Sequence, residues 1–179
     1  MWIIAAVSVL LTFAGSPAEA KFVFELNDDF EQCEPDVPFP ALNLSGLEFT
    51  ILEYNTVISG KISFTEDYEA PVRVNFRSMR LERGTWRQGD IARTEMNVCP
   101  KLLSPLEPWF CVTRHFQQKR CPFKAGHEEI LPMIEVGDFG IQLPPSFAGD
   151  WKFFMGLELK RNGRKVKECF AFTASVVEA

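Results

Sequence analysis

The segment that most restricts the fold is 151–176, where two alternating runs flank an Asn-Gly pair. In the first run, apolar residues take every second position: Trp151, Phe153, Met155, Leu157 and Leu159. Asn162-Gly163 follows, and both residue types accept the positive φ angles of a two-residue hairpin turn. In the second run, one face carries Val166, Phe170, Phe172, Ala174 and Val176, and Cys169 lies on the other face. The pattern predicts a β-hairpin with one apolar face.

Further strands are predicted upstream by apolar and β-branched runs. They cover 22–26, 47–52, 56–64 with a break at Gly60, 72–81 and 134–143. Within 72–81 the apolar positions change parity near Arg77-Ser78, which indicates a bulge. A short helix is expected at Leu102-Leu103, before Pro105, and no long amphipathic helix is evident. The chain is therefore expected to be all-β, a single-domain antiparallel β-cup or β-sandwich.

Residues 1–20 have the pattern of a signal peptide. An apolar run from Trp2 to Phe13 is followed by small residues and ends in Ala18-Glu19-Ala20. The run is too short to span a bilayer, and Ala-x-Ala is a cleavage signal. We expect cleavage after Ala20, with residues 21–179 forming one exported domain that is long enough to bury a core. The alternative is an N-terminal anchor helix.

The chain has five cysteines, which are Cys33, Cys99, Cys111, Cys121 and Cys169. In an exported protein, which folds in an oxidising compartment, cysteines are expected to form disulfides. Five is an odd number, so at least one is a thiol or pairs between chains. No Cys-x-x-Cys pair occurs and the two histidines lack ligand spacing, so no metal site is expected. Asn43-Leu44-Ser45 is an acceptor sequon that predicts glycosylation at Asn43.

Catalytic and nucleic-acid-binding signals are missing. There is no nucleophile elbow, phosphate loop or metal motif. His115 and His127 are expected on the surface, and Asp28-Asp29 in a solvated turn. A net charge of −5 without a basic stripe argues against nucleic acid. We therefore expect no enzyme activity and no cofactor.

Large apolar residues in expected loops are the features that suggest binding. Trp86 follows a turn-like Arg83-Gly84, Trp109-Phe110 lies in the cysteine-rich segment, and Phe147 follows two prolines. Exposed aromatic side chains at such places indicate a partner, a ligand mouth or a membrane edge. The alternative for each ring is that it folds back onto the core.

Several motifs in the C-terminal half resemble one known family. They are Cys121-Pro122-Phe123-Lys124-Ala125-Gly126, Leu143-Pro144, Gly149-Asp150-Trp151, Gly163-Arg164-Lys165 and the late Cys169. Their order and spacing are similar to those of the ganglioside-activator and ML lipid-recognition family, which includes arthropod chemosensory relatives. The N-terminal half matches more loosely, through Cys33 and Ile58–Ile62.

The resemblance implies a secreted cup of eight or nine strands that holds lipid chains. It implies disulfides Cys33–Cys169 and Cys99–Cys121, with Cys111 as a thiol outside both. The family's partner for Cys111 is missing here, and a further small disulfide loop has no cysteines. The residues expected to contact lipid or form the rim are Trp86, Trp109, Phe110, Phe147, Trp151 and Phe153.

The expected function is therefore non-catalytic. The chain would hold a lipid or glycolipid in the cup and transfer or present it outside the cell, with delivery to lysosomes as a further destination. Expected partners are the lipid, a membrane in transient contact, and an enzyme or receptor. Two alternatives are a chemosensory hydrocarbon or pheromone carrier and a secreted β-sandwich interaction module with a filled core.

Overall fold

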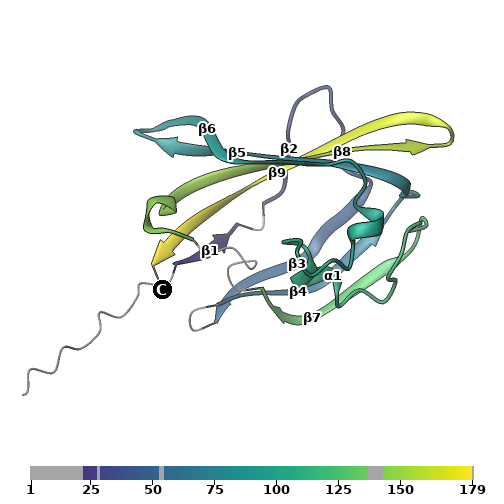
Figure 1. Cartoon of the computed structure of the whole chain (residues 1–179), viewed down its shortest axis with the longest axis horizontal. Coiled ribbons are helices and arrows are strands. Elements are labelled where there is room, and N and C mark those ends of the chain that lie inside the picture. The colour runs from purple at the N-terminus through teal and green to yellow at the C-terminus, as the bar shows by residue number, and fades with distance from the viewer. Residues whose placement is uncertain (1–21, 28, 53–54, 137–142, 179) are drawn as a thin grey trace, which may run out of the picture.

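The computed structural model describes residues 22–27, 29–52, 55–136 and 143–178, so the predicted signal peptide lies outside the described residues. The chain is all-β, as predicted, with two antiparallel sheets that form two layers (Figure 1). The larger sheet has the strand order β1-β9-β8-β5-β6, with β2 also pairing with β9. Its strands are β1 (Phe22–Leu26), β2 (Glu31–Gln32), β5 (Glu69–Glu82), β6 (Thr85–Glu95), β8 (Gly149–Arg161) and β9 (Arg164–Glu178).

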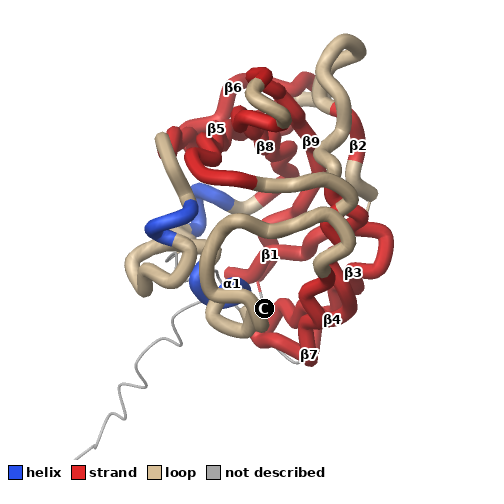
Figure 2. The backbone as a smooth tube through the Cα atoms, turned by 90° about the vertical axis from the view of Figure 1, so that its right-hand side faces the viewer, coloured by secondary structure: helices blue, strands red, loops and turns tan. Residues whose placement is uncertain are grey.

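The smaller sheet has the order β3-β4-β7. Its strands are β3 (Leu42–Leu52), β4 (Asn55–Phe64) and β7 (Glu128–Glu135). Short helical turns complete the described chain: η1 (Cys99–Lys101), α1 (Phe110–Thr113) and η2 (Pro145–Phe147). In the view of Figure 2, the helical turns in blue lie on the left, between the strands of the two sheets. None of the described helices is long and apolar enough to cross a bilayer.

The predicted hairpin at 151–176 is confirmed. Strands β8 and β9 pair in unbroken register from Gly149 with Val176 to Arg161 with Arg164. Asn162 and Gly163 have φ angles of 51° and 74°, which is the left-handed region that an Asn-Gly turn requires. This hairpin forms the centre of the larger sheet because β1 and β2 pair with β9, while β5 pairs with β8.

The bulge predicted in 72–81 is also present, because the pairing of β5 with β6 shifts between Arg77 and Met79. Strand β6 itself was not predicted. Its sequence, TWRQGDIARTE, has only two large apolar residues, so alternation is weak. Trp86 was therefore expected in a loop, but it lies in β6 opposite Leu81, directly after the turn at Arg83-Gly84.

Three other sequence-based boundaries need correction. Strand β4 continues through Gly60, which has a φ of 110° at a register shift against β7. A Cβ there would lie 1.9 Å from the carbonyl oxygen of Gly46, so only glycine fits. The strand expected at 134–143 begins earlier, at Glu128, and 137–142 lie outside the described residues. The helix expected at Leu102-Leu103 instead ends at Lys101 and has the 3₁₀ form that short proline-containing turns take.

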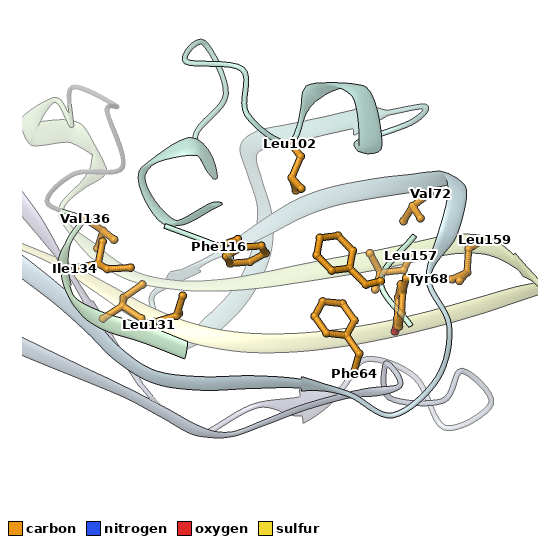
Figure 3. Packing of buried hydrophobic residues seen from close by; sticks show 12 residues of the cluster. Phe64, Tyr68, Val72, Leu102, Phe116, Leu131, Ile134, Val136, Leu157 and Leu159 are labelled. Atoms are coloured by element: carbon orange, nitrogen blue, oxygen red, sulfur yellow. The ribbon is translucent and has the colours of Figure 1, made fainter. Parts of the chain in front are cut away.

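Between the sheets, one group of buried side chains forms what we call the filled core (Figure 3). Most of these residues come from both sheets and from the segment between β6 and β7, while Tyr68 precedes β5 and Val136 follows β7. They are Ile58, Phe64, Tyr68, Val72, Leu102, Phe116, Phe123, Leu131, Ile134, Val136, Leu157 and Leu159. Phe64 and Phe123 stack at its centre with ring centroids 4.7 Å apart, and Phe116 meets Phe123 edge to face at 6.1 Å.

Candidate functional site

Beside the filled core, the inner face of the larger sheet borders an apolar cavity of about 280 Å³. Its lining residues come from five strands of that sheet and from the segment that contains α1. They are Phe24, Leu26, Val74, Phe76, Ile91, Arg93, Glu95, Pro108, Trp109, Val112, Phe153, Met155 and Phe172. No residue of β3, β4 or β7 is among them, so the cavity lies where the smaller sheet does not cover the larger one.

The sheet register explains how the aromatic wall forms. Phe153 on β8 pairs with Phe172 on β9, and Met155 pairs with Phe76 on β5. The rings of Phe76 and Phe153 stack with centroids 5.4 Å apart, and Phe153 lies at the same distance from Phe172. Because alternate residues of a strand point to one face, the period-two pattern that predicted the hairpin also builds this wall.

The cover of the cavity is a short segment with its own hydrogen bonds. Trp109 Nε1 donates to the carbonyl of Lys101 at 3.1 Å. Thr113 Oγ1 donates to the carbonyl oxygens of Leu102 and Trp109 at 2.5 and 3.1 Å. The Cys99–Cys121 disulfide closes the segment at its base. These bonds hold Trp109 and Val112 against the cavity.

Arg93 and Glu95 of β6 also belong to the lining, but the surface that faces the cavity is almost entirely apolar, so these two side chains border it with carbon atoms. Arg93 Nη2 lies 2.5 Å from Oε2 of Glu107 and 4.0 Å from Oε2 of Glu95. Lys101 Nζ donates to Glu95 at 2.5 Å, and this hydrogen bond is the main reason that the pKa of the Glu95 carboxyl lies below its ordinary value. The Arg93 guanidinium also lies 5.5 Å from the ring of Trp109.

The six residues predicted to contact lipid or to form the rim divide into three groups. Trp109 and Phe153 line the cavity. Trp151 is buried beside it, with its ring stacked on Phe147 at 5.2 Å and its Nε1 donating to the carbonyl of Phe147. Trp86 and Phe110 are half-buried and are not among the lining residues. A role of Trp86 or Phe147 at a membrane stays a prediction.

Two disulfides join Cys33 to Cys169 and Cys99 to Cys121, the pairs that the resemblance implied. Cys111 lies in α1 outside both disulfides, and its thiol donates to the carbonyl of Pro108 at 3.2 Å. Asn43 is exposed on β3, where its Oδ1 accepts hydrogen bonds from the backbone and hydroxyl of Ser45. Its glycosylation stays a prediction.

Buried carboxylates elsewhere serve the fold. Glu129 is completely buried and accepts hydrogen bonds from the backbone N–H groups of Gln117 and Gln118. His127, expected on the surface, is half-buried, and its Nε2 lies 2.7 Å from that carboxylate. Glu168 accepts hydrogen bonds from Tyr68 and Arg161. Within the described ranges, no group of three or more metal-ligand side chains comes together.

Of the thirteen lining residues, sequence reasoning selected only Trp109 and Phe153, and Arg93, Glu95 and Val112 are among those that it missed. The two charged residues lie on the strand that was not predicted, and alternation of Ile91, Arg93 and Glu95 on one face was the available signal. Val112 lies in a helix of only four residues, which leaves no period to detect.

Comparison with known proteins does not assign this chain to a family. No family model and no curated protein matches the chain. Among solved structures, the curli protein CsgC of E. coli aligns with 72% of this chain and 94% of its own, at 8% identity and a TM-score of 0.25. A similarity this low carries no argument about function.

Proposed function

We propose that this protein is a secreted, non-catalytic carrier that binds an apolar lipid chain between its larger sheet and the segment that contains α1. The observation that carries the proposal is the cavity of about 280 Å³, whose surface is almost entirely apolar. Filled sandwiches pack to crystal-like density and leave few voids larger than a water molecule. An apolar cavity of this size is therefore better suited to a ligand than to a stable void.

The driving force for binding is the removal of hydrocarbon from water. Each CH₂ group transferred into an apolar site contributes about 0.8 kcal/mol. The aromatic wall offers no hydrogen-bonding group that would compete with a chain, so the gain applies along the whole buried length. This energetics favours an alkyl or acyl chain over a polar metabolite.

The size of the cavity favours one chain. A cavity of about 150 Å³ holds a benzene molecule, and the cavity here is about 280 Å³. That space suits one hydrocarbon chain better than the several chains of a glycolipid. We therefore propose a carrier of single-chain lipids, a class that includes chemosensory carriers. The cavity disfavours the alternative of an interaction module with a filled core.

Secretion is part of the proposal and rests on two supports. The leader pattern at 1–20 predicts export. The two disulfides are stable only where the compartment is oxidising.

Native mass spectrometry of protein secreted by eukaryotic cells tests the proposal. We expect a bound mass that corresponds to a single-chain lipid and that is lost after delipidation. Delipidated protein should then bind the apolar probe 1-anilinonaphthalene-8-sulfonate or a pyrene-labelled chain. Absence of both the bound mass and probe binding in folded protein would exclude a lipid carrier.

A further inference from the structure

The cavity offers a ligand almost no hydrogen bond. Its surface is almost entirely apolar, and its few polar lining residues direct their polar ends to other partners. Arg93 pairs with Glu107. Glu95 pairs with Lys101, whose carbonyl accepts the hydrogen bond of the Trp109 indole. Within the described ranges, the lining therefore presents carbon almost everywhere.

A polar head group inside such a space would lose its hydrogen bonds to water without replacement. The cost of burying an unpaired polar group offsets the gain from burying about three CH₂ groups or more. A charged head group costs more still. This balance favours a pose in which the chain of an amphiphile lies in the cavity and its head group stays in water.

Arg93 shows where the cavity lies next to solvent. Its carbon atoms border the cavity, while its side chain is 44% exposed and its Nη2 lies 2.5 Å from Oε2 of Glu107, which is not a lining residue. Long charged side chains lie in this way when the stem covers apolar surface and the charged end stays in water. The edge of the cavity beside β6 is therefore where a head group would remain hydrated.

We propose that a hydrocarbon chain alone defines the ligand class, so that the cavity takes up the chain and contacts no polar group of the ligand. This inference rests on the proposed function and names the chemistry that the site recognises. Two sources supply that chemistry: a hydrocarbon without a head group, and an amphiphile whose head group stays in water at the edge beside β6. The site then selects its ligand by the length of the chain.

Met155 sets one limit on that length. It lines the cavity and also packs against the filled core, so its side chain lies between the two. On β8 it pairs with Phe76 of β5, which belongs to the aromatic wall. Methionine is flexible and fills irregular gaps. Replacing Met155 by alanine extends the cavity toward the filled core, and a longer chain then fits.

Displacement of a pyrene-labelled chain from the delipidated secreted protein tests the inference. The competitors are octane supplied from the vapour, octan-1-ol and octanoate, compared at about pH 8, where a carboxyl group is ionised. We expect octane to bind at least as tightly as the other two. Affinities of octan-1-ol and octanoate within about tenfold of octane identify amphiphiles as ligands. Competition by octane alone restricts the class to hydrocarbons without a head group.

Two results would overturn the inference and leave the carrier function standing. One is octan-1-ol or octanoate binding more than about tenfold more tightly than octane, because a head group would then be recognised. The other is a labelled chain that binds and that octane does not displace. If folded protein binds neither the labelled chain nor any competitor, the proposed function itself fails.

A series of chain lengths tests the limit at Met155. The series runs from hexan-1-ol to hexadecan-1-ol, or over the matching alkanes if octane alone competes. Affinity should rise about fourfold with each CH₂ group until the chain fills the cavity, and then level off. Met155→Ala should move this levelling to a longer chain. An affinity that rises through the whole wild-type series would contradict selection by length, whether or not the variant folds.

Met133→Ala is the matched control for Met155→Ala. Met133 is 70% exposed on β7 and is not a lining residue, so its removal leaves the cavity unchanged. Its affinities should level off at the same chain length as those of the wild type. The same limit in the wild type and in both variants would overturn the role given to Met155.

Discussion

The two ends of the space between the sheets differ in what fills them. At one end, side chains from both sheets interlock in the filled core, with the stacked pair Phe64 and Phe123 at its centre. At the other end, the smaller sheet contributes no lining residue, and the segment that contains α1 covers the cavity instead. The same larger sheet thus borders a packed core in one half and an apolar cavity in the other.

The difference shows that the layer packed against the larger sheet, and not the sheet itself, decides where a cavity remains. Strands β5 and β8 contribute residues to both ends: Val72 and Leu157 to the filled core, and Phe76 and Phe153 to the cavity wall. A second sheet packs continuously against such strands, whereas a short irregular segment meets them at few points. Substitutions in the filled core and substitutions around the cavity should therefore have unequal effects on the free energy of unfolding and on ligand affinity.

The two disulfides provide the largest expected contrast. Their sequence separations are 136 residues for Cys33–Cys169 and 22 for Cys99–Cys121. In the loop-entropy model, replacing each pair by alanine lowers the free energy of unfolding by about 5 and about 3 kcal/mol. Urea denaturation measures both. The second pair anchors the cavity cover, so its loss should weaken ligand binding more than the loss of the first. The reverse order in binding would contradict the assignment of the cover.

Truncating one phenylalanine at each end is the next contrast. Phe123 is 5% exposed and packs against Phe64 and Phe116, so Phe123→Ala should cost about 3–5 kcal/mol. Phe76 is half-buried and borders the cavity, so Phe76→Ala should cost about 1–2 kcal/mol, because fewer packing contacts are lost. Chemical denaturation of the two variants checks the prediction. Equal costs would mean that the two ends are packed alike.

Enlarging one valine at each end tests for free space. Val136 is buried in the filled core, so Val136→Phe should cost about 1–3 kcal/mol through overpacking. Val112 lines the cavity, so Val112→Phe should change stability by less than about 1 kcal/mol and reduce probe affinity more than about tenfold. Thermal melts and calorimetric titration measure the two effects. A large loss of stability in Val112→Phe would show that the space is not available.

The smallest expected effect concerns the hydrogen bond between Tyr68 and Glu168 in the filled core. Burial, followed by the hydrogen bond to Glu168, raises the pKa of the Tyr68 phenol. The folded state thus favours the neutral phenol. This contribution is fully present below about pH 10 and is lost as pH rises above it. Tyr68→Phe should cost about 1–2 kcal/mol at neutral pH and should reduce the alkaline loss of stability. Denaturation curves between neutral and alkaline pH measure the cost of the substitution and the loss of stability at alkaline pH. If the free energy of unfolding falls with rising pH as steeply in Tyr68→Phe as in the wild type, Tyr68 does not cause that loss.

Much of the fold was predictable, because it follows from local patterns. The Asn162-Gly163 turn, the alternation around Trp151 and the parity change at Arg77 each specify a strand feature without tertiary information. Strand β6 was not predictable in this way. Its pairing with β5, and not its own apolar pattern, holds it in the sheet.

The site was less accessible to sequence reasoning than the fold. Trp109 and Phe153 were selected as large apolar residues, and the same reasoning selected Trp151 and Phe147, which pack on each other beside the cavity. Whether an aromatic ring borders a space or fills one depends on the opposite layer, and that layer is distant in sequence. The pairing of Arg93 with Glu107 depends in the same way on the fold of the covering segment.

Methyl NMR during titration with dodecan-1-ol tests the contrast between the two ends most directly. Leu26, Val74, Ile91 and Val112 report on the cavity, and Leu131, Ile134 and Val136 report on the filled core. We predict saturable shift changes in the first group and none of comparable size in the second. Saturating probe that leaves the first group unshifted, or that shifts the second group instead, would contradict a ligand cavity at this end of the molecule.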